Sequence, residues 1–251
     1  MATIAYGIHP VREMLTERRW CFIEIHIDRA CLRRQPVEEI IQAARLRSIP
    51  VHLDDEHTLR KLAAGGVHQG VVAVLEGIPY VSIADIMEAW RTSGLKATIL
   101  ALDGVQDPHN LGALVRTAYC AGCHGIVLPR DRSASLTPAA LKASAGAAAH
   151  IPVARVTNMA SALDMLRQAG IWIIGTAPEA ATDPYETDLD MDLALVMGGE
   201  EKGLRPLVRK QCDQVLSIPM VGHISSLNVS VATGVVLFEI LRQRRFGRVS
   251  T

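Results

Sequence analysis

Hydrophobic positions in the first 76 residues switch repeatedly between a helical and a strand-like period. Proline suits the first turn of a helix, so we expect a helix from near Pro10. Apolar residues alternate over 21–27, which predicts a strand, and recur three and four apart over 36–48, which predicts an amphipathic helix. A strand, a helix and an apolar strand are expected at 51–53, 54–63 and 70–75. The order predicts a small α/β sandwich in residues 1–76.

Residues 77–95 break this alternation, because two glycines and a proline surround a single predicted helix from Ile83 to about Thr92. We interpret this segment as a linker whose helix can pack on either neighbour.

A longer alternation begins at Ala97, and residues 96–251 are predicted to form a second domain. Its strands are apolar throughout, which indicates burial on both faces of a mostly parallel sheet covered by helices. Strands are expected at 97–103, 125–129, 171–177, 193–198 and 215–220, and helices at 111–122, 137–149, 159–170 and 226–244. Ligands of such sheets bind beyond the carboxyl ends of the strands. The loops that follow residues 103, 198 and 220 are therefore the first candidates for a functional site.

The last predicted helix has an unusual distribution of side chains. Val231, Val235 and Phe238 fall at helical spacing with Leu227 and predict its buried face. The opposite face carries Ser230, Thr233 and Gly234, which are small or polar rather than charged. A narrow, polar first turn of this kind indicates that a ligand approaches the start of the helix.

Composition narrows the class of protein without naming it. The chain has 251 residues, of which 49% are hydrophobic, 21% charged and only 4% aromatic, as expected for a helix-covered parallel sheet. The formal net charge is zero, so bulk electrostatics neither support nor exclude a nucleic-acid partner. No stretch reaches the roughly 18 apolar residues of a membrane span, and no signal-peptide pattern is present, so we expect a cytoplasmic protein.

The five cysteines include one CxxC, formed by Cys120 and Cys123. A second CxxC or a nearby histidine pair would be needed for a typical zinc site, and neither is present. We therefore expect free thiols in a reducing compartment and no metal.

Each of the three loops carries candidate chemistry, although each also has a purely structural explanation. Asn110 follows a turn at Asp107-Pro108 and is either a helix cap or a functional amide, with Arg116 six residues further on. Glycines 198, 199 and 203 enclose Glu200, Glu201 and Lys202 in a tight turn or a binding loop. Ser226 is either a helix cap or a functional hydroxyl. Their coincidence at one edge of the sheet favours function.

The common nucleotide and metal signatures are missing from the chain. There is no GxxxxGK[ST], no GxGxxG after a strand and no HExxH. We therefore expect a ligand held largely by backbone groups of the three loops.

Three ordered segments resemble the motifs of the SpoU (TrmH-like) family of ribose 2′-O-methyltransferases. They are LDGVQDPHNLGALVRTAYCAG (102–122), LVMGGEEKGLRP (195–206) and IPMVGHISSLNVSVATGVVLFE (218–239). GVHQGVVA (66–73) resembles the end of the family's N-terminal RNA-binding domain, and with it the resemblance covers nearly the whole chain. The resemblance implies a SPOUT-type α/β domain with a trefoil knot, a homodimer, and S-adenosylmethionine as cofactor.

The resemblance also implies roles for individual residues. Cofactor binding is implied for Gly198, Ile218 and Leu227, with Gly175, Thr176 and Ala177 nearby. Functional polar residues of the family match Asn110, Arg116, Glu200, Ser226 and Asn228. One departure is visible: the middle motif reads Gly199-Glu200-Glu201, with glutamate where related sequences have glycine, which bears on the conformation of the loop.

The expected activity is methyl transfer from S-adenosylmethionine to the ribose 2′-hydroxyl of a guanosine in 23S rRNA, either naked or in a ribosomal precursor particle. The two-domain length and the HQG stretch favour this subgroup over single-domain tRNA ribose methyltransferases, which remain the alternative. A non-catalytic RNA-binding protein is disfavoured because the motif residues occur together, and a metabolic α/β enzyme is disfavoured because no other catalytic constellation is present.

Arg116 is interpreted as a phosphate clamp and alkoxide stabiliser rather than a base. Lowering the pKa of a guanidinium from its strongly basic ordinary value to near neutrality would cost roughly 8 kcal/mol.

Overall fold

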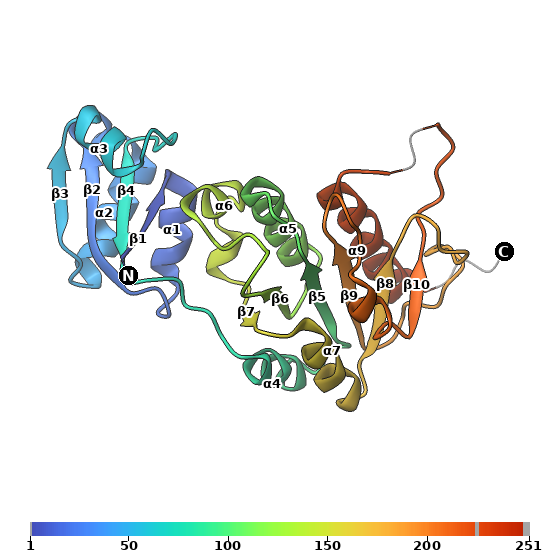
Figure 1. Ribbon diagram of the computed structural model, residues 1–251. Coiled ribbons are helices and arrows are strands. Elements are labelled where there is room, and N and C mark those ends of the chain that lie inside the picture. Colours follow the sequence, from blue (N-terminus) through green and yellow to red (C-terminus); the bar gives the residue numbers. More distant parts are fainter. Residues whose placement is uncertain (1, 224–225, 248–251) are drawn as a thin grey trace. The chain divides into compact units, whose positions relative to one another are not determined.

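The computed structural model describes residues 2–223 and 226–247, and Figure 1 labels its helices and strands. Contacts divide the chain into two compact units. The first contains residues up to 79 together with 111–116 and 135–150, and the second contains 80–110, 117–134 and the residues from 151 onward. No helix among the described residues is long and apolar enough to cross a membrane.

The first unit contains a four-stranded mixed sheet in the order β1-β4-β2-β3. β4 pairs antiparallel with β1 and β2, and β3 pairs parallel with β2. The strand β1 was not predicted. The bounds are β1 (Thr3–Tyr6), α1 (Ile8–Thr16), β2 (Phe22–Asp28), η1 (Arg29–Cys31), α2 (Gln35–Leu46), β3 (Val51–Asp54), α3 (Glu56–Leu62) and β4 (Val71–Leu75).

The second unit is built on a six-stranded, entirely parallel sheet in the order β10-β8-β9-β5-β6-β7. The predicted parallel sheet is therefore confirmed, although β7 was missed at the edge. The central β5 is buried along its whole length. The strands are β5 (Thr98–Asp103), β6 (Gly125–Pro129), β7 (Val153–Val156), β8 (Trp172–Thr176), β9 (Leu193–Gly198) and β10 (Gln214–Leu216).

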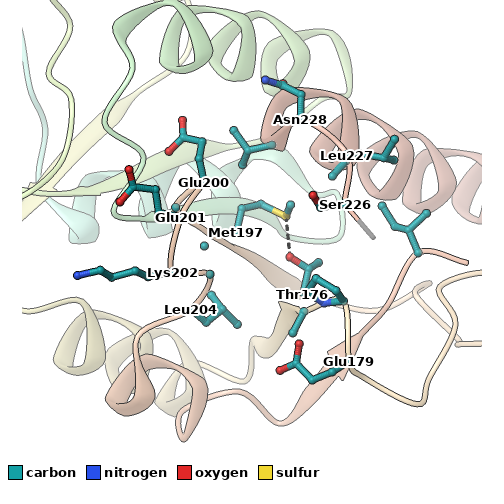
Figure 2. A pocket seen from close by; sticks show the side chains of 18 of the residues that line it. Thr176, Glu179, Met197, Glu200, Glu201, Lys202, Leu204, Ser226, Leu227 and Asn228 are labelled. Carbon is teal, nitrogen blue, oxygen red and sulfur yellow. Dashed lines mark hydrogen bonds between the residues drawn. The ribbon is translucent and has the colours of Figure 1, made fainter. Parts of the chain in front are cut away.

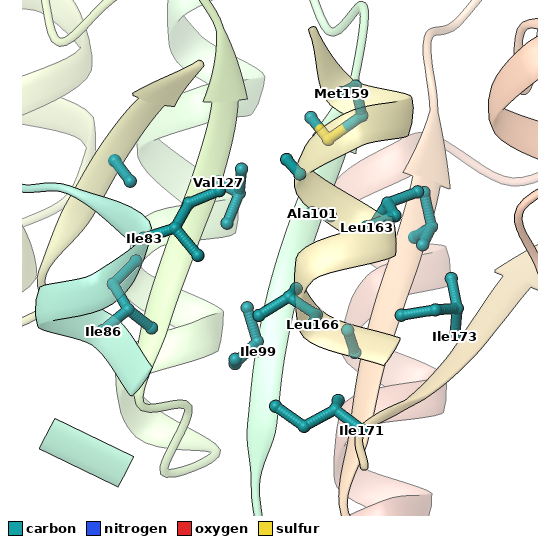
Figure 3. Close-up of a cluster of buried hydrophobic side chains, with 14 of the residues drawn as sticks. Ile83, Ile86, Ile99, Ala101, Val127, Met159, Leu163, Leu166, Ile171 and Ile173 are labelled. Atoms are coloured by element: carbon teal, nitrogen blue, oxygen red, sulfur yellow. The ribbon is translucent and has the colours of Figure 1, made fainter. Parts of the chain in front are cut away.

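Helices cover this sheet. The linker helix belongs to the second unit, where Ile83 and Ile86 join the buried cluster that also contains Val127 of β6 (Figure 3). Leu163 and Leu166 pack in the same cluster. The helices of the second unit are α4 (Ile83–Ser93), α7 (Met159–Gln168), α8 (Pro206–Arg209) and α9 (Val229–Phe246). The helix α5 (Pro108–Cys120) has residues in both units, and α6 (Pro138–Ala143) and η2 (Ala147–Ala149) belong to the first.

The prediction of which face of α9 is buried is wrong. Val231 and Phe238 are 52% and 49% exposed, whereas Thr233 and Gln243 are buried. The polar atoms on the buried face are satisfied: the Thr233 hydroxyl donates to the Val229 carbonyl at 2.7 Å, and the Gln243 amide donates to the Thr187 carbonyl at 3.0 Å. Hydrophobic spacing alone predicted that the opposite side of the helix is buried. That side is apolar but exposed to solvent in the single chain.

Candidate active site

The three candidate loops meet at one edge of the parallel sheet, as predicted. Asp103, the last residue of β5, pairs in register with Gly198, the last residue of β9. The loop between β9 and α8 therefore starts beside the loop between β5 and α5. Asn228, the N-cap of α9, reaches the same edge through its hydrogen bond to Asn110.

An ion pair between the buried Asp103 carboxylate and the partly exposed Arg205 side chain fixes the β9–α8 loop at this edge. Asp103 is only 1% exposed, and its two oxygens accept the Arg205 backbone N–H at 2.9 Å and the Arg205 Nε at 2.6 Å. The Gly199 N–H donates to the Asp103 carbonyl at 3.0 Å, so both ends of the loop are tied to the end of β5. The loop therefore has a defined position before any ligand binds.

The glycines of this loop allow its backbone to approach other backbone closely. A Cβ on Gly198 would lie 2.2 Å from the carbonyl carbon of Gly203, and one on Gly199 would lie 2.5 Å from the Gly104 oxygen. Neither neighbour is a flexible side chain that could move aside. Glu201 is not among the residues with positive φ, so glutamate fits at this position without the strain that would call for glycine.

A chain of side-chain hydrogen bonds joins the three loops. The Asn110 amide donates to Glu200 Oε1 at 2.8 Å, and the Asn228 amide donates to Asn110 Oδ1 at 3.1 Å. Asn228 Oδ1 in turn accepts from the Ser230 N–H at 2.9 Å. Each amide therefore has its oxygen and one N–H engaged and retains a second N–H donor. The chain orients both amides with a carboxylate at its end.

The bonds also decide between the structural and functional interpretations left open by the sequence. The cap of α5 is Asp107, whose Oδ1 accepts from the His109 N–H, and the cap of α9 is Asn228. Asn110 and Ser226 are therefore not the caps of these helices, and capping does not explain them.

A first pocket of about 660 Å³ opens between the β9–α8 loop, the segment after β8 and the start of α9 (Figure 2). Its floor includes Met197, whose sulfur accepts from the Thr176 hydroxyl at 3.3 Å. Five of the six predicted cofactor residues line it, together with three of the predicted catalytic residues: Thr176, Ala177, Gly198, Ile218 and Leu227, and Glu200, Ser226 and Asn228.

Gly175 does not line the first pocket. A Cβ there would lie 2.7 Å from the Cys212 sulfur, so this glycine serves close packing beneath the site.

A second pocket of about 410 Å³ lies on the other side of the β9–α8 loop. Residues 199–203 line both pockets, and Asn110 lines the second. Arg132, Gln106 and Asp107 complete its wall, and the sequence did not indicate the first two of these as site residues. The only signal available for Arg132 was its place shortly after a buried strand, on a stretch without glycine.

Arg116 is on α5 but lines neither pocket, and it is exposed. Successive residues of an α-helix are about 100° apart around its axis, so six residues amount to about 600°, which is 120° short of two full turns. Arg116 therefore points about 120° away from Asn110 around the axis of α5. The structure therefore groups Asn110, Glu200, Ser226 and Asn228 but leaves Arg116 apart from them.

The cysteines form no recognisable site. Cys120 is exposed and Cys123 is buried, and burial raises the pKa of the Cys123 thiol to about 12. Across residues 2–223 and 226–247, no group of three histidine, cysteine or acidic side chains could hold a metal ion.

A parallel sheet with three polar loops gathered at one edge is the arrangement expected of an α/β methyltransferase, and the chain belongs to the SpoU rRNA methylase family. The model of that family matches residues 97–238, and the model described as RNA 2′-O ribose methyltransferase substrate binding matches residues 4–81.

Among curated proteins, the chain is similar to the 23S rRNA (guanosine-2′-O-)-methyltransferases RlmB of Yersinia pestis and Escherichia coli K12. Identities are 45% and 43%, over 97% of this chain and 98% and 100% of the relatives.

Two solved structures share the fold over nearly the whole chain. The AdoMet-bound rRNA methyltransferase of Sinorhizobium meliloti matches with a TM-score of 0.80 and 26% identity, covering 98% of this chain and 88% of that one. The SpoU methyltransferase AviRb of Streptomyces viridochromogenes matches with a TM-score of 0.84 and 25% identity, covering 99% and 92%.

Proposed function

We propose that this protein transfers a methyl group from S-adenosylmethionine to the ribose 2′-hydroxyl of a guanosine in 23S rRNA. The observation that carries the proposal is the hydrogen-bonded chain Glu200–Asn110–Asn228 at the boundary between two pockets. The similarity to 23S rRNA (guanosine-2′-O-)-methyltransferases over nearly the full length supports the choice of substrate.

The first pocket is the proposed cofactor site, and its residues fit the group. Its volume lies within the range of small-molecule sites, about 300–1,000 Å³. Ile218 and Leu227 offer apolar surface for an adenine, while Ala177 and Gly198 bring backbone groups to the wall. S-adenosylmethionine supplies an activated methyl group, so the protein's task is to position the ribose and stabilise its oxygen.

Asn110 and Asn228 are proposed to hold the reacting ribose. Each has one N–H left to donate, and donors fixed in advance are what stabilise a developing alkoxide. Glu200 acts as a positioning residue through Asn110, and Ser226 contributes a hydroxyl at the rim of the first pocket. Arg116, which is exposed on α5 outside both pockets, is proposed to bind an RNA phosphate rather than to act as a base.

Residues 1–76 are proposed to bind the RNA, with 77–95 as the linker and 96–251 as the catalytic domain. Some arginines of the first segment are structural: Arg47 donates to the Trp20 carbonyl at 2.8 Å, and Arg19 donates to the Ala149 carbonyl. Arg33 and Arg34 are instead exposed at the start of α2. Replacing both with serine should weaken RNA binding, whereas Arg60→Ser, which removes only an exposed pair with Glu56, should not.

The exposed apolar face of α9 is proposed to bind a second copy of the chain. Val231 and Phe238 lie seven residues apart and therefore on the same side of the helix. We expect Phe238→Asp to convert a dimer to monomers in sedimentation experiments. Leu207→Asp on α8, which is more exposed, should leave the dimer intact. A cytoplasmic location follows from the proposed substrate.

One assay tests the proposal. The full-length protein is incubated with tritiated S-adenosylmethionine and 23S rRNA, transfer RNA or no RNA, and labelled nucleotides are identified. We expect 2′-O-methylguanosine in 23S rRNA alone, and strong loss of the signal in Asn110→Ala. Label in transfer RNA only would identify the tRNA alternative, and no transfer to any RNA would refute an enzymatic role.

A further inference from the structure

The second pocket has a wall assembled from two adjacent strand ends. Gln106 and Asp107 come from the loop after β5, and Arg132 comes from the segment after β6. The two segments are bonded together, because the Val105 carbonyl accepts from the Ala134 N–H at 2.8 Å and from the Ser133 hydroxyl at 3.2 Å. The pocket wall is therefore fixed at the backbone level.

Arg132 occupies a backbone conformation that arginine rarely adopts. Its φ is 56°, in the left-handed region where glycine, asparagine and aspartate are favoured. Within the described part of the chain, no hydrogen bond or ion pair engages its side chain. A strained residue with an unengaged guanidinium at a pocket wall is typical of a position kept for a ligand.

The groups that line this pocket match the hydrogen-bonding pattern of guanine. Guanine presents two acceptors, O6 and N7, on one edge, and arginine donates to both at once. Its adjoining Watson–Crick edge presents two N–H donors, on N1 and N2, from which a carboxylate can accept hydrogen bonds. Asp107 has Oδ1 engaged as the cap of α5 and retains Oδ2 for such a contact. Adenine would place an amino donor where guanine has O6, facing the guanidinium.

We propose that Arg132 and Asp107, which both line the second pocket, recognise the base of the target guanosine there. The inference rests on the proposed function and specifies how its nucleotide is selected. Asn110 and Glu200 line this same pocket, and Glu200 also lines the first, so a ribose between them joins a base on one side to the methyl donor on the other. A base held in this way leaves its stack, as for other enzymes that act on single nucleotides.

The test combines a protein change with a base change. The methylated nucleotide is first mapped with the wild-type protein, and RNA fragments are then made with guanine, 7-deazaguanine or hypoxanthine at that position. Single-turnover methyl transfer is measured for the wild type, Arg132→Asn and Arg130→Asn. Asparagine tolerates the left-handed backbone, and Arg130 is an exposed neighbour outside both pockets.

With guanine, Arg132→Asn should react about ten- to a hundred-fold more slowly than the wild type, because one bidentate contact is lost. Arg130→Asn should react at the wild-type rate. The 7-deaza substitution, which removes N7, should slow the wild type but slow Arg132→Asn little further. Hypoxanthine lacks the 2-amino group and should slow both proteins. Affinity for S-adenosylmethionine, measured by calorimetry, should be unchanged.

Several outcomes would overturn the inference while leaving the proposed function intact. One is an equal loss in the two arginine variants, which would indicate general attraction to RNA. Another is the same 7-deaza penalty in the wild type and Arg132→Asn, which would place the contact to N7 elsewhere. If the wild type methylates no guanosine in the first step, the proposed function itself fails.

Discussion

Asp103 and Glu200 are two carboxylates at the same edge of one sheet, and they have opposite surroundings. Asp103 is almost completely buried, and its bonds go to the backbone and guanidinium of a single residue, Arg205. Glu200 is exposed between two pockets and bonds the amide of Asn110, which has another donor to offer a ligand. Proximity to the site therefore does not make a carboxylate functional; its role depends on the group that donates a hydrogen bond to it.

The largest expected effect tests the structural half of this comparison. Arg205→Ala leaves Asp103 buried without its cation, and breaking a buried pair in this way costs about 3–5 kcal/mol. Denaturant unfolding of the full chain measures the loss. An unfolding free energy within 0.5 kcal/mol of the wild type, which is about the scatter for surface substitutions, would show that Asp103 is not held by this pair.

The next effect concerns Arg116, the candidate residue that lies apart from both pockets. Arg116→Ala should reduce turnover by about 10²–10³-fold with little change in stability or cofactor affinity, by analogy with the loss of one oxyanion-hole donor. Arg116→Lys should retain part of the activity because a cation remains, although without the bidentate fork.

The pH–rate profile of Arg116→Lys under single-turnover conditions distinguishes a phosphate-binding role of Arg116 from a role as general base. A rate that rises with the titration of lysine near pH 10, absent from the wild type, would contradict the clamp.

A smaller effect tests the functional half of the comparison. Glu200→Gln keeps an acceptor for the Asn110 amide but removes the charge, and a charge-assisted hydrogen bond exceeds a neutral one by about 1 kcal/mol. We expect roughly fivefold slower turnover and an unfolding free energy like that of the wild type. A large loss of stability in this variant would place Glu200 with Asp103 rather than apart from it.

The smallest effect concerns a third carboxylate, Glu239 on α9. Its bond from Arg242 holds the pKa of this carboxyl below its ordinary value of 4.5. A lowered folded pKa stabilises the protein above the unfolded pKa, and the contribution is lost as pH falls through the folded value. Thermal unfolding between pH 3 and 7 should show that the free energy of unfolding falls at acid pH (the acid limb). Glu239→Gln should reduce that fall by no more than about 1 kcal/mol. Glu201→Gln should leave that limb unchanged.

The sequence predicted the site better than it predicted the surface. Strand-end reasoning predicted that the loops carrying Asn110, Glu200 and Ser226 share an edge, because the carboxyl ends of parallel strands do so, and the family resemblance added Asn228. The edge strands β1 and β7 were missed, although the equally short edge strand β3 was predicted. Hydrophobic spacing placed Val231 and Phe238 of α9 in the interior, since a pattern reports which residues are apolar and not what covers them.

Two other features could not have been predicted from local sequence. Asp103 and Arg205 are about a hundred residues apart, and only the register of β5 with β9 reveals that they pair. Arg132 depends on a backbone angle that no neighbouring residue type signals.

The loop of residues 199–203 is a partition with one face toward each pocket. A ligand in either pocket would contact the same loop, residues 199–203. Occupancy of the two sides is then linked thermodynamically, and the factor by which one ligand tightens or loosens the other is the same in both directions. Measuring the affinity for RNA with and without S-adenosylhomocysteine, and the reverse, would give that factor twice, and the two values must agree.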